Sequence, residues 1–232
     1  MPHKLIYLAR RNPHIRPEDF GEAWQSHSRL ASTLGPQFAK HFTRVRQCIK
    51  VYGADVPPEY INEYDGTALL TMKSWYDLWA ARSYPDALET MRNDERRVFA
   101  EYAANFTMAV EEIVKQGDGD GGAALISFVR RKSSVPHETF DAAWRAHAGR
   151  LFESDAARGV CSAVLNRVVE SPGPRYEFAG VSESWFADAD SALKAAWDPV
   201  RRKCVLEVEP IADLAGSVSL LVRINFEKIP SA

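Results

Sequence analysis

The sequence repeats itself with a spacing of 120 residues. Four positions of a predicted strand recur at that spacing, where Leu5, Ile6, Arg10 and Arg11 match Leu125, Ile126, Arg130 and Arg131. The agreement continues into the predicted helix that follows, where Phe20, Trp24 and His27 match Phe140, Trp144 and His147. So many coincidences at one spacing indicate an internal duplication. The chain is therefore expected to fold as two copies of one unit.

A glycine-rich segment at the middle of the chain separates the two copies. Residues 116–122 read Gln-Gly-Asp-Gly-Asp-Gly-Gly, a composition typical of linkers. We therefore divide the chain into a first repeat at 1–115, a linker at 116–122 and a second repeat at 123–232. Each repeat has the size of a small domain.

Hydrophobic periodicity and the positions of Gly and Pro predict the same order of elements, β-α-β-β-α-β, in both halves. In the first half we expect strands at 4–11, 43–52, 66–73 and 105–114, a helix at 16–32 and a helix at 75–102 that Pro85 interrupts. In the second half we expect strands at 123–131, 159–169, 177–186 and 217–227, and helices at 136–154 and 189–202. Residues 203–214 read as extended and irregular.

This order is the split β-α-β arrangement of the ferredoxin-like fold. Each four-stranded antiparallel sheet would have helices on one face and a bare apolar face on the other. Two such bare faces exclude water by packing against each other. The predicted fold class is therefore α+β, with two tandem ferredoxin-like units whose sheets pack face to face as an α+β barrel.

Charge and missing motifs exclude several function classes. The chain has 29 basic and 31 acidic residues, so it lacks the positive surplus typical of proteins that bind nucleic acid or anionic membranes. Its three cysteines lack the spacing of a zinc site or a disulfide framework. No HExxH or GxSxG motif occurs, and no glycine-rich phosphate loop leads from a strand into a helix. We therefore expect no metal and no other cofactor.

The same features predict where the protein works and what it meets. The apolar run at the N-terminus is too short for a signal peptide, and no apolar span of about 18 residues occurs. We expect a protein of a reducing, cytoplasmic compartment. Its expected partner is a small hydrophobic or aromatic substrate, with no nucleic acid and no membrane, and a homodimer is an open alternative.

An aromatic stripe that ends in histidine gives the strongest candidates for chemistry. Its residues are spaced i, i+4 and i+7, so they lie on one helix face in each repeat. A helix must bury such a stripe against its sheet, and a histidine there is most often a packing residue. The other interpretation is a proton-transfer group beside an aromatic-lined pocket. In that interpretation the catalytic candidates are His27 and His147, and the substrate-lining candidates include Trp24 and Trp144.

The first repeat resembles the EthD-like family of the dimeric α+β barrel proteins. The likeness rests on LIYLARR…FGEAWQSHSRLA, on Tyr64–Gly66 before the third strand, and on Asp94 and Phe99 before the last strand. The second repeat matches at FDAAWRAHAGRL and FAGVSESWF but lacks counterparts of Asp94 and Phe99. The proline that usually follows the family's histidine is absent from both repeats. The resemblance implies cofactor-free chemistry on hydrophobic, often aromatic or polyketide-like molecules, with the helix-end histidine as acid or base.

Three further residues are weaker substrate-binding candidates. Gln47 and Asn166 align as amides in the second strands, where an inward amide would bind a substrate carbonyl or phenol and an outward one would be solvated. Tyr7 has a hydroxyl suited to a developing oxyanion, although Ser127 replaces it in the second repeat. The arginine pairs that end the first strands are either anion sites or a solvated rim.

These observations favour a cofactor-independent lyase that acts on a hydrophobic aromatic or polyketide-like molecule by dehydration, decarboxylation, C–C cleavage or cyclisation. Two alternatives stay open. One is an oxygenase of the same superfamily, either haem-dependent or cofactor-free, and the other is a non-catalytic small-molecule-binding barrel. We expect His27 to be the working histidine, because its repeat keeps Tyr7, Gln47, Asp94 and Phe99.

Overall fold

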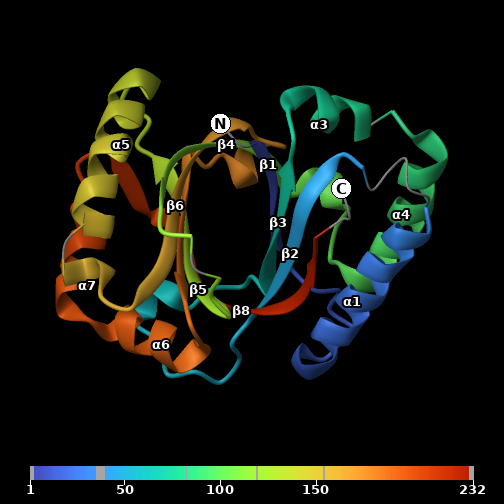
Figure 1. The fold of residues 1–232 in the computed structure, drawn as a ribbon, viewed down its shortest axis with the longest axis horizontal. Coiled ribbons are helices and arrows are strands. Elements are labelled where there is room, and N and C mark those ends of the chain that lie inside the picture. Colours follow the sequence, from blue (N-terminus) through green and yellow to red (C-terminus); the bar gives the residue numbers. More distant parts are fainter. Residues whose placement is uncertain (1–2, 35–39, 82, 119, 154, 230–232) are drawn as a thin grey trace.

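Eight antiparallel strands form a closed barrel in the computed structural model, which describes residues 3–34, 40–81, 83–118, 120–153 and 155–229 (Figure 1). The first half contributes β1 (His3–Ala9), β2 (Phe42–Lys50), β3 (Gly66–Met72) and β4 (Thr107–Gln116). The second half contributes β5 (Ala123–Arg131), β6 (Val160–Glu170), β7 (Gly180–Phe186) and β8 (Ala212–Lys228). The expected α+β class is confirmed.

Both halves have the same strand order. Around the barrel the order is β1-β3-β2-β8-β5-β7-β6-β4, so the first half reads β4-β1-β3-β2 and the second reads β8-β5-β7-β6. The two sheets do more than face each other, because β2 pairs with β8 and β4 pairs with β6. These two edge pairings close the barrel and leave neither sheet with a free edge.

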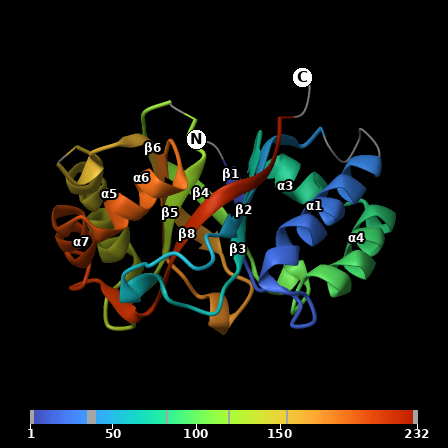
Figure 2. The same ribbon diagram turned by 90° about the horizontal axis from the view of Figure 1, so that it is seen from below.

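Helices cover the barrel on two opposite sides (Figures 1 and 2). On the first-half side lie α1 (Pro17–Thr33), α3 (Trp75–Ala81) and α4 (Pro85–Val98). On the second-half side lie α5 (His137–Glu153), α6 (Ala189–Trp197) and α7 (Pro199–Leu206). Short 3-10 turns occur at η1 (Pro58–Tyr60), η2 (Ala103–Asn105), η3 (Asp155–Ala157) and η4 (Pro174–Tyr176). Each sheet therefore packs its outer face against its helices, and a layer of side chains lies between them.

In each half, one proline divides the second helical segment into two helices. Pro85 begins α4, as expected, and Pro199 begins α7 inside the segment that was expected to be one helix. Proline fits the first turn of a helix because the N–H it lacks has no partner there. The Asp198 side chain accepts a hydrogen bond from the Arg201 N–H and caps α7. The expectation of extended structure after residue 202 is therefore wrong up to Leu206, and β8 begins at Ala212, earlier than expected.

Two glycines explain why an aromatic-x-Gly sequence precedes the third strand of each half. A side chain at Gly66 would come within 2.7 Å of the Trp24 ring, and one at Gly180 would come within 2.6 Å of the Trp144 ring. The missing side chains let each tryptophan lie directly against the strand. The motif therefore fixes how closely the first helix of each half packs on its sheet.

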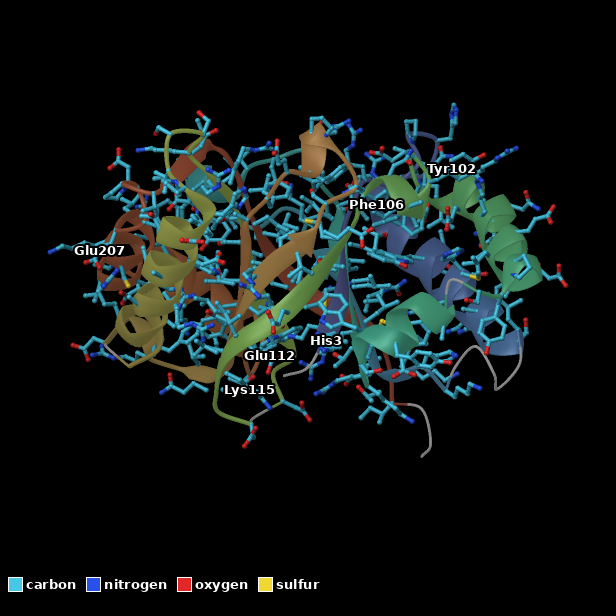
Figure 3. All side chains as sticks on the ribbon, turned by 90° about the horizontal axis from the view of Figure 1, so that it is seen from above. His3, Tyr102, Phe106, Glu112, Lys115 and Glu207 are labelled. Atoms are coloured by element: carbon cyan, nitrogen blue, oxygen red, sulfur yellow. The ribbon has the colours of Figure 1, made fainter. Side chains whose placement is uncertain are left out.

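The barrel interior contains charged groups. Lys4 Nζ on β1 donates to Glu183 Oε1 at 2.7 Å and pairs with Glu112 Oε2 at 3.1 Å. The contact with Glu183 joins β1 to β7, which are not neighbours in the sheet. Burial alone would lower the pKa of Lys4, but the two carboxylates raise it above its usual value. These three residues line a cavity of about 430 Å³ at one mouth of the barrel. Figure 3 shows Glu112 and Lys115 on β4 at the same mouth, near His3.

Candidate active site

The aromatic stripe of α1 faces the sheet, as its spacing predicts. Phe20 and Trp24 are 0% and 2% exposed, and their rings lie 5.1 Å apart. His27 follows one turn later and is also buried. Trp24 packs edge-on against Phe99, which caps the end of α4. The stripe therefore places His27 in the layer between the sheet, α1 and α4.

A carboxylate holds His27 in place. Its Nδ1 lies 2.8 Å from Asp94 Oδ2, and the Arg97 guanidinium binds the same carboxylate at 2.9 and 3.1 Å. Asp94 and Arg97 both lie on α4, so the three residues connect the two helices of the first half. The sequence marked Asp94 only as a family landmark, and the structure shows that it is the partner of His27.

The electrostatics of the pair favour a neutral histidine. Burial lowers the pKa of His27 below its usual value, although the hydrogen bond and the charge of Asp94 oppose this effect. Burial alone would raise the pKa of Asp94, but hydrogen bonds from Arg97 and His27 hold it below its usual value. A neutral imidazole beside an ionised carboxylate donates from Nδ1, and its Nε2 keeps a lone pair. His27 is thus prepared to accept a proton.

An aromatic wall connects His27 with Tyr7. The His27 and Phe99 ring centroids lie 5.5 Å apart, those of Phe99 and Phe106 lie 5.3 Å apart, and those of Phe106 and Tyr7 lie 5.7 Å apart. Phe99 and Phe106 are buried, whereas Tyr7 is partly exposed. Three of the predicted residues, Tyr7, Trp24 and His27, therefore belong to one aromatic cluster.

Gln47 lies on the same outer face as Tyr7. The strand register pairs both residues with Ala68, so they stand on either side of this small residue. The Gln47 Nε2 donates to Ser28 Oγ of α1 at 3.1 Å, and its Oε1 accepts from Asn225 at 3.1 Å. The amide is therefore buried in a network that fastens α1 to the sheet.

Asn166 does not lie on the outer face of its sheet, as Gln47 does. In the second half the corresponding strand register pairs Ser182 with Leu165, so Leu165 is the counterpart of Gln47. Asn166 is the next residue along the strand, and a shift of one residue moves a side chain to the opposite face of a sheet. Its Nδ2 accordingly donates to Glu183 Oε1 at 2.9 Å, inside the barrel. The alignment of Asn166 with Gln47 is wrong by one position.

The second-half histidine has different surroundings. His147 is 2% exposed and stacks on Trp144 with ring centroids 5.7 Å apart. Its Nδ1 is buried and has no hydrogen-bond partner among the residues that the structure describes. Burial and the nearby Arg150 lower the pKa of His147 to about 4. His147 and Trp144 thus lie where the repeat predicts, without a carboxylate that would orient the imidazole.

The layer around His147 is filled by apolar side chains. The buried cluster to which its stacking partner Trp144 belongs also includes Phe140, Ala148, Leu151, Phe152, Ala163, Leu165 and Cys204. In the first half, Val45 and Leu70 on the outer face of the sheet stay partly exposed, whereas their register counterparts Ala163 and Ser184 are 2% and 1% exposed. The first-half layer is the more accessible of the two.

A second histidine–carboxylate pair in the first half was missed by the sequence analysis. His41 Nδ1 lies 2.8 Å from Asp77 Oδ1, and Ser74 Oγ donates to the other oxygen of the same carboxylate. The His41 Nε2 lies 3.3 Å from the Tyr84 hydroxyl. These contacts connect the start of β2 with α3 and α4. No repeat or motif marks His41, so the sequence contained no signal for it.

Within the described ranges no three His, Cys, Asp or Glu residues form a group able to hold a metal ion. Nor does any helix in the described part have the length and apolar character needed to cross a membrane.

Comparisons with known proteins place the chain by its fold. No model of a known protein family and no curated protein sequence matches it, so the EthD resemblance remains a prediction. A crystal structure of an anthrone oxidase-like protein has a TM-score of 0.67 with 12% identity, covering 98% of this chain and 92% of that one. A Fusobacterium nucleatum protein described provisionally as a monooxygenase has a TM-score of 0.63 with 7% identity, covering 100% and 95%.

A mutant chlorite dismutase from Candidatus Nitrospira defluvii is also similar, with a TM-score of 0.55 and 8% identity, covering 96% of this chain and 90% of that one. Identities this low establish a shared fold and no more. The chain therefore has the α+β barrel architecture of these proteins across almost its whole length.

Proposed function

We propose that the protein is a cofactor-free oxygenase in which His27 is the general base and Asp94 orients it. The observation that carries this proposal is the pair formed by buried His27 and half-buried Asp94 beside an aromatic wall. The similar folds include a provisionally described monooxygenase and an anthrone oxidase-like protein, which supports the oxygenase alternative better than the lyase. The proposed substrate class is a hydrophobic phenol or aryl ketone with an acidic C–H group.

The first step is proton removal. His27 Nε2 takes the proton from a CH₂ group that is conjugated through an aromatic ring with a ketone, and the imidazolium is stabilised by Asp94 on Nδ1. Phe99 and Phe106 exclude water from the carbanion, and the Tyr7 hydroxyl is proposed to donate to the developing enolate oxygen.

Dioxygen then accepts the electrons. The carbanion transfers one electron to O₂, and the two radicals combine to form a C–O bond. The imidazolium returns its proton to give a hydroperoxide, which loses water and leaves a carbonyl group. The net reaction is R₂CH₂ + O₂ → R₂C=O + H₂O, so neither a metal nor an external reductant enters the balance.

Haem fits poorly beside the second-half histidine. His147 is 2% exposed and stacks on Trp144, whose buried cluster includes Leu151, Phe152 and Cys204, so its imidazole is not open to a bound haem. No step is therefore assigned to haem. A Soret band in the purified protein would contradict the cofactor-free proposal.

Oxygen uptake with anthrone as the probe substrate tests the proposal. We expect turnover that stops without O₂, and a loss of about 10²–10⁴-fold in His27→Ala with an unchanged melting temperature. Turnover that continues without O₂ would favour the lyase. Saturable binding of anthrone with no turnover, in air or without it, would favour the non-catalytic barrel.

Asp94→Asn tests the orienting role. Turnover should fall about 10²-fold. Because Asp94 raises the pKa of His27, its removal should also move the acid limb of the rate profile to lower pH. A lower rate with an unmoved acid limb would contradict the coupling between the two residues. Arg97→Lys, which keeps the charge beside Asp94, is the matched control.

A further inference from the structure

The arginine pairs that end β1 and β5 occupy equivalent positions in different electrostatic surroundings. In the first half Arg10 pairs with Glu63 at 3.1 Å and with Glu101 at 3.5 Å, and Arg11 lies 3.4 Å from Asp65. That pair is neutralised by carboxylates. It gives an internal reference for the second pair.

The second pair makes main-chain contacts instead of ion pairs. Arg130 donates to the carbonyls of Gly216, Pro174 and Arg175. Arg131 donates to the carbonyls of Lys132 and Val135 and to His137 Nε2. Within the described ranges no carboxylate lies within 4.0 Å of either guanidinium or of the Lys132 ammonium. Three neighbouring cations thus lack a direct counter-charge.

One substitution between the halves accounts for much of this difference. Asp65 in Tyr64-Asp65-Gly66 has Ala179 as its counterpart in Phe178-Ala179-Gly180. The carboxylate that neutralises Arg11 is therefore replaced by a methyl group beside Arg131. Ala179 lines a cavity of about 440 Å³ together with the three cations. The volume lies in the range of small-molecule sites.

Some guanidinium N–H groups at the cavity have no hydrogen-bond partner among the described residues. Arg131 Nε is one of them, and in the first half Arg10 Nε and Arg11 Nε have no such partner either. A guanidinium has five N–H groups, and the contacts of Arg130 use three of them. Ser133 and Ser134 line the same cavity, which lies at the start of the 17-residue helix α5. The helix N-terminus adds a positive field to that of the side chains.

We propose that this cavity is a binding site for a small molecule with an oxyanion group, such as a phosphate ester. Glu177 and Asp213 also line it, but three cations still exceed two carboxylates. Asp213 Oδ1 accepts a hydrogen bond from the Gly216 N–H at 3.1 Å. Arg130 lies 5.0 Å from the Phe178 ring, so the wall next to the anion site is aromatic. The site is independent of His27 and of the proposed oxygenase activity.

Calorimetric titration of the full chain with inorganic phosphate in a low-salt buffer tests the proposal. We expect saturable binding of one equivalent. Ala179→Asp restores the carboxylate of the first half and should weaken binding about tenfold or more. Lys132→Glu changes a side chain with no described contact and should weaken binding similarly, which covers the case in which Ala179→Asp disturbs the fold.

Lys203→Glu, an exposed change of equal charge on α7, is the matched control and should leave binding unchanged. Titrations with sulfate and acetate separate a phosphate-like group from a carboxylate, and preferential binding of either supports an oxyanion site. The proposal is overturned if wild type binds none of the three anions saturably. It is also overturned if Ala179→Asp and Lys132→Glu bind phosphate as wild type does, or if Lys203→Glu weakens binding as much as Lys132→Glu.

Discussion

His147 should make the protein less stable as the pH falls. Its pKa is about 4 in the folded chain and about 6.5 in the unfolded chain. Above pH 6.5 the ring is neutral in both states and adds no pH dependence. Between pH 6.5 and pH 4 the imidazole of His147 is protonated in the unfolded chain but stays neutral in the folded chain, so the free energy of unfolding decreases. With these pKa values the loss from pH 7 to pH 5 is about 2 kcal/mol.

The variant that isolates this effect is His147→Phe. Phenylalanine preserves the stacking on Trp144 and removes a buried Nδ1 that has no described partner, so stability at pH 7 should change little or increase. Urea unfolding at pH 7 and pH 5 measures the effect. The difference between the two pH values should be about 2 kcal/mol smaller in His147→Phe than in wild type.

The control is Phe152→Leu, a change in the same buried cluster that adds or removes no titratable group. It should lower the free energy of unfolding by a similar amount at both pH values. Equal pH dependence in wild type and His147→Phe would refute the reasoning, because the imidazole would then have a similar pKa in both states.

Two further changes test the packing of the barrel. Gly66→Ala should lower the free energy of unfolding by about 1–3 kcal/mol in urea denaturation, since the added methyl meets the Trp24 ring and the strand beside it, and an unchanged midpoint would contradict this close contact. Lys4→Met should cost about 3–5 kcal/mol by the same assay, because Glu183 and Glu112 would stay buried without a cation, and the double variant with Glu183→Gln should recover part of the loss.

The sequence was sufficient to predict the order of elements because its signals are local. Pro85 marked a helix break, and the periodicity of Phe20, Trp24 and His27 marked the buried face of α1. The closure of the barrel was harder to predict from the sequence, because the pairing of β2 with β8 joins residues far apart in the chain. The break between α6 and α7 was missed because only Pro199 and the Asp198 cap mark it, and the extension of α7 to Leu206 was missed as well.

The candidate site shows the same limit. The repeat identified both histidines, but only the tertiary structure shows that one has a carboxylate partner and the other has none. Asn166 was wrongly aligned with Gln47, and because side chains alternate along a strand, this error of one residue puts the two amides on opposite faces of the sheet. His41 and Asp77 are 36 residues apart and belong to no motif, so their contact follows only from the fold.

Comparison of the two halves suggests a division of roles. The first half keeps Asp94 beside His27 and Asp65 beside Arg11, so its proton-transfer pair is oriented and its arginines are neutralised. In the described part of the second half, neither His147 nor Arg131 has a carboxylate contact of this kind. Without a carboxylate partner the buried imidazole of His147 has a lowered pKa, whereas Arg131, which also lacks a carboxylate partner, stays charged and belongs to the proposed oxyanion site. The absence of a carboxylate therefore has opposite consequences for the two side chains, because burial favours an uncharged imidazole and a guanidinium stays charged.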